Sequence, residues 1–256
     1  MNTHRRQILK ASAASLALPA LVSPWARAQD RYPSRSISLI CPWPPGGSSD
    51  AVVRAIGEAL GRALGGASVT IENKPGAGGT LGASAMLHAR PDGYTLTQLP
   101  LGIYRLPHMQ KMPFHPVNDI THIACLTGYT FGIVSTLEAP FKTIREMVAW
   151  AKANPGKLSY GHTGVGTTPH LAFEEFADKA GFSTNHIPYK GSAEILQAIL
   201  GGQIPVMSGT TEFVPHVQAG RLRFLSTLGR QRTKAFPDVP TVKESGWDTI
   251  TESPFG

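Results

Sequence analysis

The sequence has little charge, little cysteine and no long apolar run. Only 16% of its 256 residues are charged while 41% are hydrophobic, which is typical of globular proteins and excludes a wholly disordered chain. No apolar stretch reaches the roughly 20 residues that a membrane-spanning helix needs. Glycine and proline are abundant instead, at 27 and 21 residues, and they predict many turns and shaped loops.

The formal net charge of +7 is concentrated at the N-terminus. Residues 1–28 contain four basic and no acidic residues, so the rest of the chain has 20 basic against 17 acidic residues. No cluster of five or more Lys and Arg remains, and no aromatic residues alternate with basic ones. The charge pattern therefore does not indicate binding to nucleic acid.

The N-terminal segment has the layout of an export signal. Arg5 and Arg6 precede a mild apolar stretch at 11–22, and an Ala-x-Ala cleavage signal ends at Ala28. We expect a twin-arginine-type signal peptide over 1–28, cleaved after Ala28, with general secretion as the alternative route. Because no cysteine follows the apolar stretch, a lipid anchor is not expected. The mature protein is predicted to be periplasmic.

Cys41 and Cys125 lie in apolar surroundings 84 positions apart. Two buried small hydrophobic side chains are the simpler interpretation. The compartment also permits a disulfide, and the sequence leaves that pairing open.

Strand-like and helix-like segments alternate in the first part of the mature chain. The order is strand, helix, strand, helix, strand, which predicts parallel pairing with right-handed crossovers. The expected strands are 36–41, 69–72 and 94–99, and the expected helices begin at Ser48 or Ser49 and at Thr80.

A second alternating set follows after a long connection at about 100–140. Its expected helices are 143–153, one beginning near Pro169, and 193–200, and its expected strands are 158–161 and 186–189. Two such sets predict an α/β protein with two lobes and a cleft between them.

Three glycine-rich loops join predicted strands to predicted helices, at 44–50, 73–80 and 161–168. Each places free backbone N–H groups at a helix N-terminus, which attracts anions, and glycine lets a ligand approach the backbone closely. Tight turns that only pack helix on sheet are the alternative for any single loop. Two such loops on different lobes, each followed by hydroxyl side chains, favour anion binding.

Other chemistries lack their motifs. The third loop has no Lys before Thr167, as a triphosphate-binding loop requires, and no complete dinucleotide fingerprint, nucleophile elbow, HExxH or CxxC occurs. His162 and His170 could meet at a metal, but a spacing of eight without a third ligand is weak. We therefore predict no metal, no cofactor and no catalytic residue. Asp50 would repel an anion, so it is expected to brace its loop through Arg54.

The mature chain resembles the periplasmic solute-binding proteins of tripartite tricarboxylate transporters, the family known for its expansion in Bordetella. The resemblance runs from Ile37 to about Gly246, and the order and spacing of its motifs are specific. These motifs are PGGSSD at 45–50, ENKPGAGG at 72–79, PDGYTL at 91–96, ANPGKL at 153–158, GVGT at 164–167, PYKG at 188–191, GGQ at 201–203 and PDVPTVKESG at 237–246.

The resemblance implies a type II-like periplasmic binding protein, in which each lobe is a mostly parallel sheet flanked by helices. It implies lobe 1 at 29–125 plus 229–256 and lobe 2 at 126–228. It also implies a monomer that captures a small organic acid between the lobes and delivers it to the membrane subunits of the transporter.

The resemblance, together with the loops, also predicts the site. The expected ligand-binding residues are Pro44, Pro45, Gly46, Gly47, Ser48, Thr163, Gly164, Val165, Gly166, Thr167, Thr168 and His170. Asp50, Gly78 and Gly79 are expected to brace the loops, and segments 101–105 and 207–212 are expected to select the rest of the ligand.

Two further expectations complete the sequence-based picture. Similar proteins continue for several tens of residues beyond the position of Gly256, so the resemblance predicts that a C-terminal part of the first lobe is missing. The alternative function is a periplasmic hydrolase or isomerase acting on a small carboxylate, with His162 or His170 and Thr167 as its poor candidate residues.

Overall fold

The first lobe is built around β1 (Ile37–Cys41), the middle strand of a three-stranded sheet. Its neighbours are β2 (Val69–Asn73) on one side and β3 (Thr95–Thr97) on the other, and both pair with it in parallel. Four of the five residues of β1 are buried, because it has a strand on each side and helices over it. The strand–helix–strand order predicted from the sequence, with its parallel pairing, is confirmed.

The long helix α2 (Ser48–Ala63) packs closely on β2. Gly57 and Gly61 lie one turn apart on the face of α2 that contacts the sheet. A Cβ atom at Gly57 would lie 2.9 Å from the side chain of Ile71, and one at Gly61 would lie 2.7 Å from the Ala67 carbonyl oxygen. Glycine at these positions therefore allows the helix to approach the strand.

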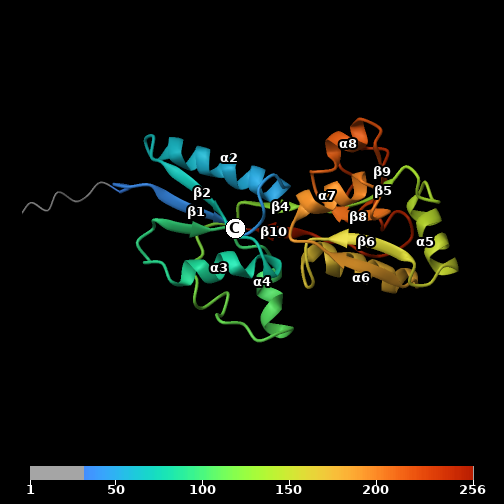
Figure 1. Ribbon diagram of the computed structural model, residues 1–256, viewed down its shortest axis with the longest axis horizontal. Helices are drawn as coiled ribbons and strands as arrows, with labels where there is room; N and C mark the ends of the chain where they lie inside the picture. The colour runs from blue at the N-terminus through green and yellow to red at the C-terminus, as the bar shows by residue number, and fades with distance from the viewer. Residues whose placement is uncertain (1–31, 256) are drawn as a thin grey trace, which may run out of the picture. The chain divides into compact units, whose positions relative to one another are not determined.

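Shorter helices complete the first lobe. A 3-10 turn η2 (Ala77–Gly79) leads into α3 (Thr80–Leu87), which lies on the side of the sheet opposite α2 (Figure 1). The segment after β3 forms α4 (Gly102–Arg105) and a 3-10 turn η3 (Leu106–His108). These last two elements lie in the stretch that the sequence suggested was a plain connection.

The second lobe contains a five-stranded sheet in the order β7-β6-β8-β5-β9. β6 pairs in parallel with β7 and β8, whereas β5 pairs antiparallel with β8 and β9, so this sheet is mixed. The strands are β5 (Gly132–Thr136), β6 (Leu158–His162), β7 (Thr184–Pro188), β8 (Val206–Gly209) and β9 (Leu222–Thr227).

Four helices belong to the second lobe. They are α5 (Ile144–Ala153), α6 (Thr168–Ala180), α7 (Ser192–Leu200) and the short α8 (Val214–Gln218). The side chain of Thr143 caps α5 by accepting a hydrogen bond from the Glu146 N–H at 3.2 Å. Figure 1 shows α6 and α7 on opposite sides of the sheet.

The two faces of this sheet bury different cores. Val206 belongs to the core under α5 and α6, and its neighbour Met207 belongs to the core under α7, because successive strand residues point to opposite faces. In the first of these cores the rings of Tyr160 and Phe173 stack with centroids 3.9 Å apart. The second sheet is therefore covered on both faces.

A two-stranded antiparallel ribbon is formed by β4 (Thr127–Tyr129) and β10 (Ser253–Phe255). The chain between β9 and β10 packs on the second lobe: Val242 lies in the core under α5 and α6, and Trp247 packs edge-on against Phe176 at 5.4 Å. The sequence predicted that 229–256 belongs to the first lobe, but these residues contact the second lobe. We propose instead that the boundary between the second lobe and the returning first-lobe segment lies next to β10.

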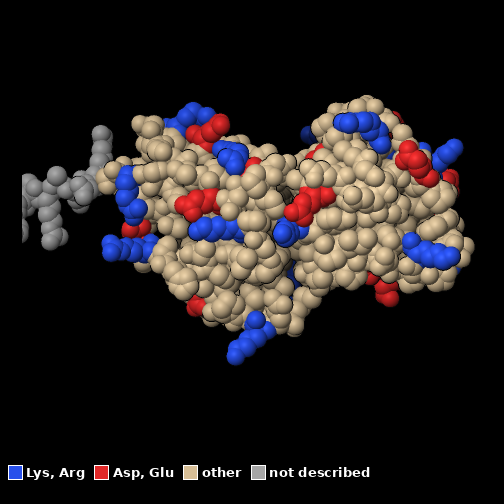
Figure 2. Space-filling view, viewed as in Figure 1, with Lys and Arg blue, Asp and Glu red and all other residues tan. Residues whose placement is uncertain are grey.

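The computed structural model describes residues 32–255, so the predicted signal peptide and its cleavage after Ala28 lie outside the described residues. Within residues 32–255 no helix is long and apolar enough to cross a membrane. Cys41 is buried and Cys125 is exposed, and neither forms a disulfide, so the expectation of two buried cysteines is wrong for Cys125. Charged side chains are scattered over the face shown in Figure 2, with no broad field of one sign.

Candidate ligand-binding site

A cavity lies between the two sheets, and both lobes contribute to its wall. The volume in which the centre of a water molecule can lie is about 60 Å³. A single water needs roughly 10–15 Å³ on this measure, so the space suits a small molecule. The first lobe contributes Trp43 and Gly47, and the second contributes Thr168 and Ser208.

Three helix N-termini converge on this cavity. Its lining includes the start of α2 at Gly47 and Ser48, the start of α6 at Thr167 and Thr168, and the first residue of α7, Ser192. The N-caps of α2 and α7 are glycines, Gly47 and Gly191, and the side chain of Thr167, the N-cap of α6, accepts no hydrogen bond from the first turn. The exposed N–H groups and the helix dipoles make such ends favourable for an anion.

Hydroxyl groups at the cavity join the two lobes. Ser48 Oγ lies 2.8 Å from Thr210 Oγ1, and the Tyr129 hydroxyl donates to Ser49 Oγ at 2.9 Å. Burial raises the pKa of Tyr129, so its hydroxyl stays protonated and remains a donor.

Thr168, which lines the cavity, has a hydroxyl proton that its two hydrogen bonds do not use. Its oxygen accepts hydrogen bonds from Ser253 Oγ at 3.2 Å and from Arg105 Nη1 at 3.1 Å. Because these two bonds use the lone pairs of Thr168, its own proton has no acceptor in them. Thr168 therefore adds a donor next to the N–H groups at the start of α6.

Two buried polar atoms of the lining have no hydrogen-bond partner among the described residues. They are the indole Nε1 of Trp43 and the Oγ of Ser208. A buried polar group without a hydrogen-bond partner costs about 1–3 kcal/mol of stability. A ligand that forms hydrogen bonds with these two atoms removes that cost and binds more tightly.

Glu212 is the one charged side chain among the described lining residues, and no Lys or Arg belongs to that lining. Its Oε1 accepts from the Thr210 N–H at 3.0 Å, and its Oε2 accepts from the Thr210 hydroxyl at 2.8 Å. The sequence pointed to the segment 207–212 as a selector but did not single out Glu212. An anion in this cavity has to be held by neutral donors, with one carboxylate nearby.

The structure brings half of the predicted ligand-binding residues into the cavity wall. The lining contains Pro44, Gly47, Ser48, Thr163, Thr167 and Thr168. The other predicted residues lie outside it: Pro45, Gly46, Gly164, Val165, Gly166 and His170. The lining also includes residues that the sequence did not suggest as binding residues, among them Trp43, next to Pro44, and Tyr129 and Ser192, which come from segments distant in the chain.

Asp50 holds the first loop in shape. Its carboxylate accepts hydrogen bonds from the Gly46 N–H at 3.0 Å, from Arg54 Nε at 3.0 Å and from Asn73 Nδ2 at 2.8 Å. Burial opposes the charge, but these hydrogen bonds together hold the pKa of Asp50 below its usual range. Its oxygens are therefore occupied by the protein.

Gly78 and Gly79, the other predicted bracing residues, adopt left-handed backbone angles with φ of 63° and 96°. Gly78 lines the cavity and lies against Thr167 of the second lobe. A Cβ atom at Gly79 would lie 2.7 Å from the ring of Pro100. The backbone angles favour glycine at both positions, and the close contact with Pro100 favours it at Gly79 as well.

Two α/β lobes with a cavity between them, and helix N-termini directed at that cavity, define a solute-binding protein. The comparison with protein families agrees: residues 52–256 match the model of the tripartite tricarboxylate transporter family receptor, TctC. The chain belongs to this family, whose members are periplasmic solute-binding receptors and not enzymes. The hydrolase or isomerase alternative is therefore set aside.

Two curated relatives illustrate the match. The chain is 45% identical over 245 residues to the UPF0065 protein in gbd 5'region of Cupriavidus necator, which covers 96% of this chain and 75% of that protein. It is 33% identical to Protein BugT of Bordetella pertussis, over 88% of this chain and 70% of BugT.

Solved structures of the same kind carry ligands. An R. palustris protein with adipate matches with a TM-score of 0.82 at 28% identity, over 88% of this chain and 76% of that one. MatC from Rhodopseudomonas palustris with bound malate matches with a TM-score of 0.81 at 28% identity, over 88% of this chain and 78% of MatC. The two-lobe α/β fold expected from the sequence is thereby confirmed.

Proposed function

We propose that this protein captures a small organic acid in the cavity between its lobes and delivers it to the membrane subunits of a tripartite tricarboxylate-type transporter. The convergence of three helix N-termini on one cavity without a basic side chain carries this proposal. Such a wall suits a carboxylate, which accepts hydrogen bonds from several N–H groups at once. The adipate and malate bound by its structural relatives support the same ligand class.

The available donors are sufficient for useful affinity. A hydrogen bond to a charged group contributes roughly 1.5–3 kcal/mol, and micromolar binding requires about 8 kcal/mol. Three or four such bonds therefore supply an upper limit near that value, before the cost of ordering the ligand and the loops is subtracted. The N–H groups of α2 and α6, with the hydroxyl of Thr168, provide enough donors.

The family and the sequence support the proposed delivery and location. We expect a monomer that is exported through its N-terminal signal and works in the periplasm, as the family's receptors do. Closure on the ligand requires that the ligand bind the closed arrangement more tightly than the open one. The hydroxyl contacts between the lobes fit such a closed arrangement.

A substitution at Gly47 tests this function. A side chain there points toward Ser192 of the other lobe, since a Cβ atom would lie 2.7 Å from Ser192 Oγ. Titration calorimetry of the exported chain with a panel that includes adipate and malate should find at least one acid that binds. Gly47→Asp should abolish that binding, because it adds negative charge and bulk where the carboxylate lies.

Gly47→Ala is the matched control, because it adds a methyl group without charge. We expect this variant to keep measurable affinity, since the Ser192 hydroxyl can turn away. If Gly47→Asp binds organic acids as tightly as the unmodified protein does, the ligand lies elsewhere. If the protein converts the bound acid into another compound, the proposed receptor function is wrong.

A further inference from the structure

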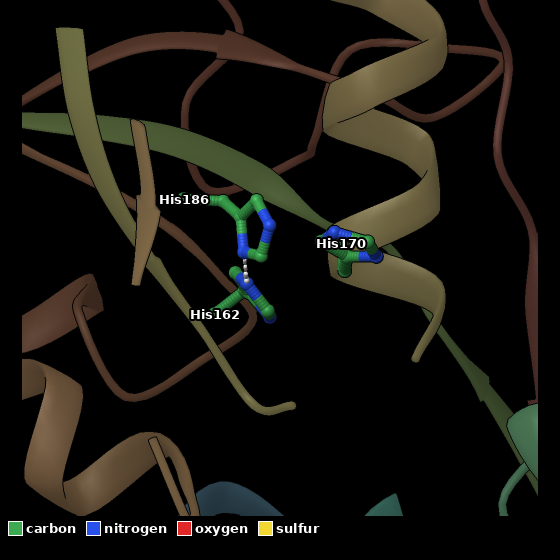
Figure 3. Close-up of side chains that lie close together, drawn as sticks. All are labelled: His162, His170 and His186. Atoms are coloured by element: carbon green, nitrogen blue, oxygen red, sulfur yellow. Dashed lines mark hydrogen bonds between the residues drawn. The ribbon is translucent and has the colours of Figure 1, made fainter. Parts of the chain in front are cut away.

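Three histidine side chains from three elements meet at one side of the second sheet. His162 ends β6, His170 lies in the first turns of α6, and His186 lies on the edge strand β7 (Figure 3). The ring centroids are 4.5, 4.8 and 5.2 Å apart. One ring nitrogen from each residue lies within 4.8 Å of the other two.

The surroundings keep two of these rings neutral. Burial lowers the pKa of His162 to about 3, and burial together with the neighbouring His186 lowers the pKa of His170. A neutral imidazole has a lone pair, which is the form that binds a metal ion. His186 is exposed, so an ion has a route from solvent to the cluster.

A carboxylate stands close by. Glu174 lies one turn after His170 on α6, and its Oε1 accepts hydrogen bonds from the Tyr160 hydroxyl at 2.7 Å and from Thr184 Oγ1 at 2.8 Å. Its negative charge acts on His170. A cation bound by the three rings would be partly compensated by this fixed charge.

We propose that His162, His170 and His186 form a binding site for a divalent transition metal ion that prefers imidazole ligands, Zn²⁺ in the first place. Three histidines with a fourth position left for water are a known ligand set for zinc. Imidazole also suits copper and nickel, whereas magnesium and calcium prefer oxygen ligands. The site lies outside the lining of the ligand cavity and does not depend on the proposed receptor function.

The distances require only a small adjustment. With Zn–N bonds of about 2.0–2.1 Å, tetrahedral geometry places two ligand nitrogens about 3.3 Å apart. His162 Nε2 and His186 Nδ1 are already 3.1 Å apart, joined by a hydrogen bond whose proton the metal would displace. The widest pair has to close by about 1.5 Å, within reach of rotation about side-chain bonds.

The metal would also act on the third glycine-rich loop. With the metal on Nε2, His162 Nδ1 carries the proton and donates to the Gly164 carbonyl oxygen, 2.9 Å away, and it no longer accepts from the Gly164 N–H at 3.2 Å. Donation to a backbone carbonyl is how metal-binding histidines are commonly oriented. His170 Nδ1 accepts a long hydrogen bond, 3.3 Å, from the Gly166 N–H. Metal binding through either nitrogen of His170 breaks that bond, since it either occupies Nδ1 or requires a proton on it.

Metal titration of the tag-free full chain tests the site. After treatment with a chelator and its removal, calorimetry with Zn²⁺ alone should show one ion bound per chain. Co²⁺ in its place should give the strong visible absorption of four-coordinate cobalt. His186→Ala should weaken Zn²⁺ binding at least about tenfold, and this residue is exposed, so its replacement leaves the buried core unchanged.

His88→Ala is the matched control, because His88 is also exposed and lies at the end of α3, in the other lobe. It should leave Zn²⁺ affinity unchanged. Circular dichroism checks that His186→Ala is folded, and His186→Gln repeats the test if it is not. Failure of the unmodified chain to bind Zn²⁺, or equal affinity in the His186 variants, overturns the proposal and leaves the cluster as packing only.

Discussion

Ser48 Oγ and Thr210 Oγ1 lie 2.8 Å apart, although they are 162 positions apart in the chain. The single hydroxyl proton of Thr210 goes to Glu212 Oε2, so Ser48 must be the donor in its contact with Thr210. A directed chain of hydrogen bonds thus runs from the start of α2 in the first lobe to a carboxylate in the second. This chain of hydrogen bonds holds Glu212 at the cavity, so one part of the cavity wall presents a carboxylate that accepts hydrogen bonds.

We expect Glu212→Gln to increase the affinity for simple dianionic acids by roughly tenfold, because it removes a negative charge from the cavity wall while one oxygen remains to accept from Thr210. An acid that carries an ammonium group should instead bind more weakly to this variant. Calorimetry at low ionic strength measures both effects.

Glu58→Gln is the control for this change, because Glu58 is exposed on α2. Among the described residues its only ion pair is with Arg62, at an N–O distance of 3.9 Å. Equal affinities of the Glu212 and Glu58 variants for both kinds of acid would show that Glu212 does not take part in ligand selection.

The pH dependence of stability should reveal the buried histidines. Burial lowers the pKa of His162 to about 3 and lowers that of His170, so below about pH 6.5 the unfolded chain binds protons that the folded chain does not. This contribution to stability is therefore complete above pH 6.5 and is lost as the pH falls toward 3. We expect the free energy of unfolding in urea to decrease by up to about 1.4 kcal/mol per pH unit for one such group.

Carboxylates also titrate on the acid side, so the comparison that matters is between variants. The groups around His162 are His170, His186 and the Gly164 backbone, and Glu174 acts on His170. His162→Asn removes the ionisable ring, and its stability should depend less on pH between 6.5 and 5. The measurement is made with chelator present, and identical slopes in both proteins would contradict the assignment.

The sequence predicted well those helices and strands whose signals come from residues close together in the chain. The apolar run at 37–41 and the loop with hydroxyls before α2 predicted a strand and a helix within a few residues of those observed. Their signals are periodicity, capping and turn residues, which depend on neighbours in the chain.

Features made by distant segments could not be predicted in this way. β5 is a short strand between β8 and β9 in the second sheet, and it lay within the segment that the sequence suggested was a connection. Tyr129 from β4 and Ser192 from the start of α7 meet at the same cavity only in the folded chain. His186 joins His162 through the parallel pairing of β6 and β7, so spacing in the sequence did not reveal a third histidine.

Gly132 at the start of β5 leaves room for two aromatic rings. A Cβ atom there would lie 2.6 Å from Phe224 and 2.7 Å from Phe213, whose rings pack on each other with centroids 5.0 Å apart. Real Cβ atoms do not come so close, so the rings have to shift, and Phe213 is buried in the core under α7. We expect Gly132→Ala to lower the free energy of unfolding by about 1–3 kcal/mol through overpacking.

Gly102→Ala is the control for that substitution, because a Cβ atom at Gly102 would meet its nearest neighbour at an ordinary 3.6 Å and the residue begins a helix. Alanine is favoured over glycine in a helix, so this variant should be as stable as the unmodified protein or slightly more stable. Urea unfolding at neutral pH measures all three proteins. If Gly132→Ala matches the unmodified stability, the rings of Phe213 and Phe224 have space that the structure does not show, and close packing is not what requires glycine at the start of β5.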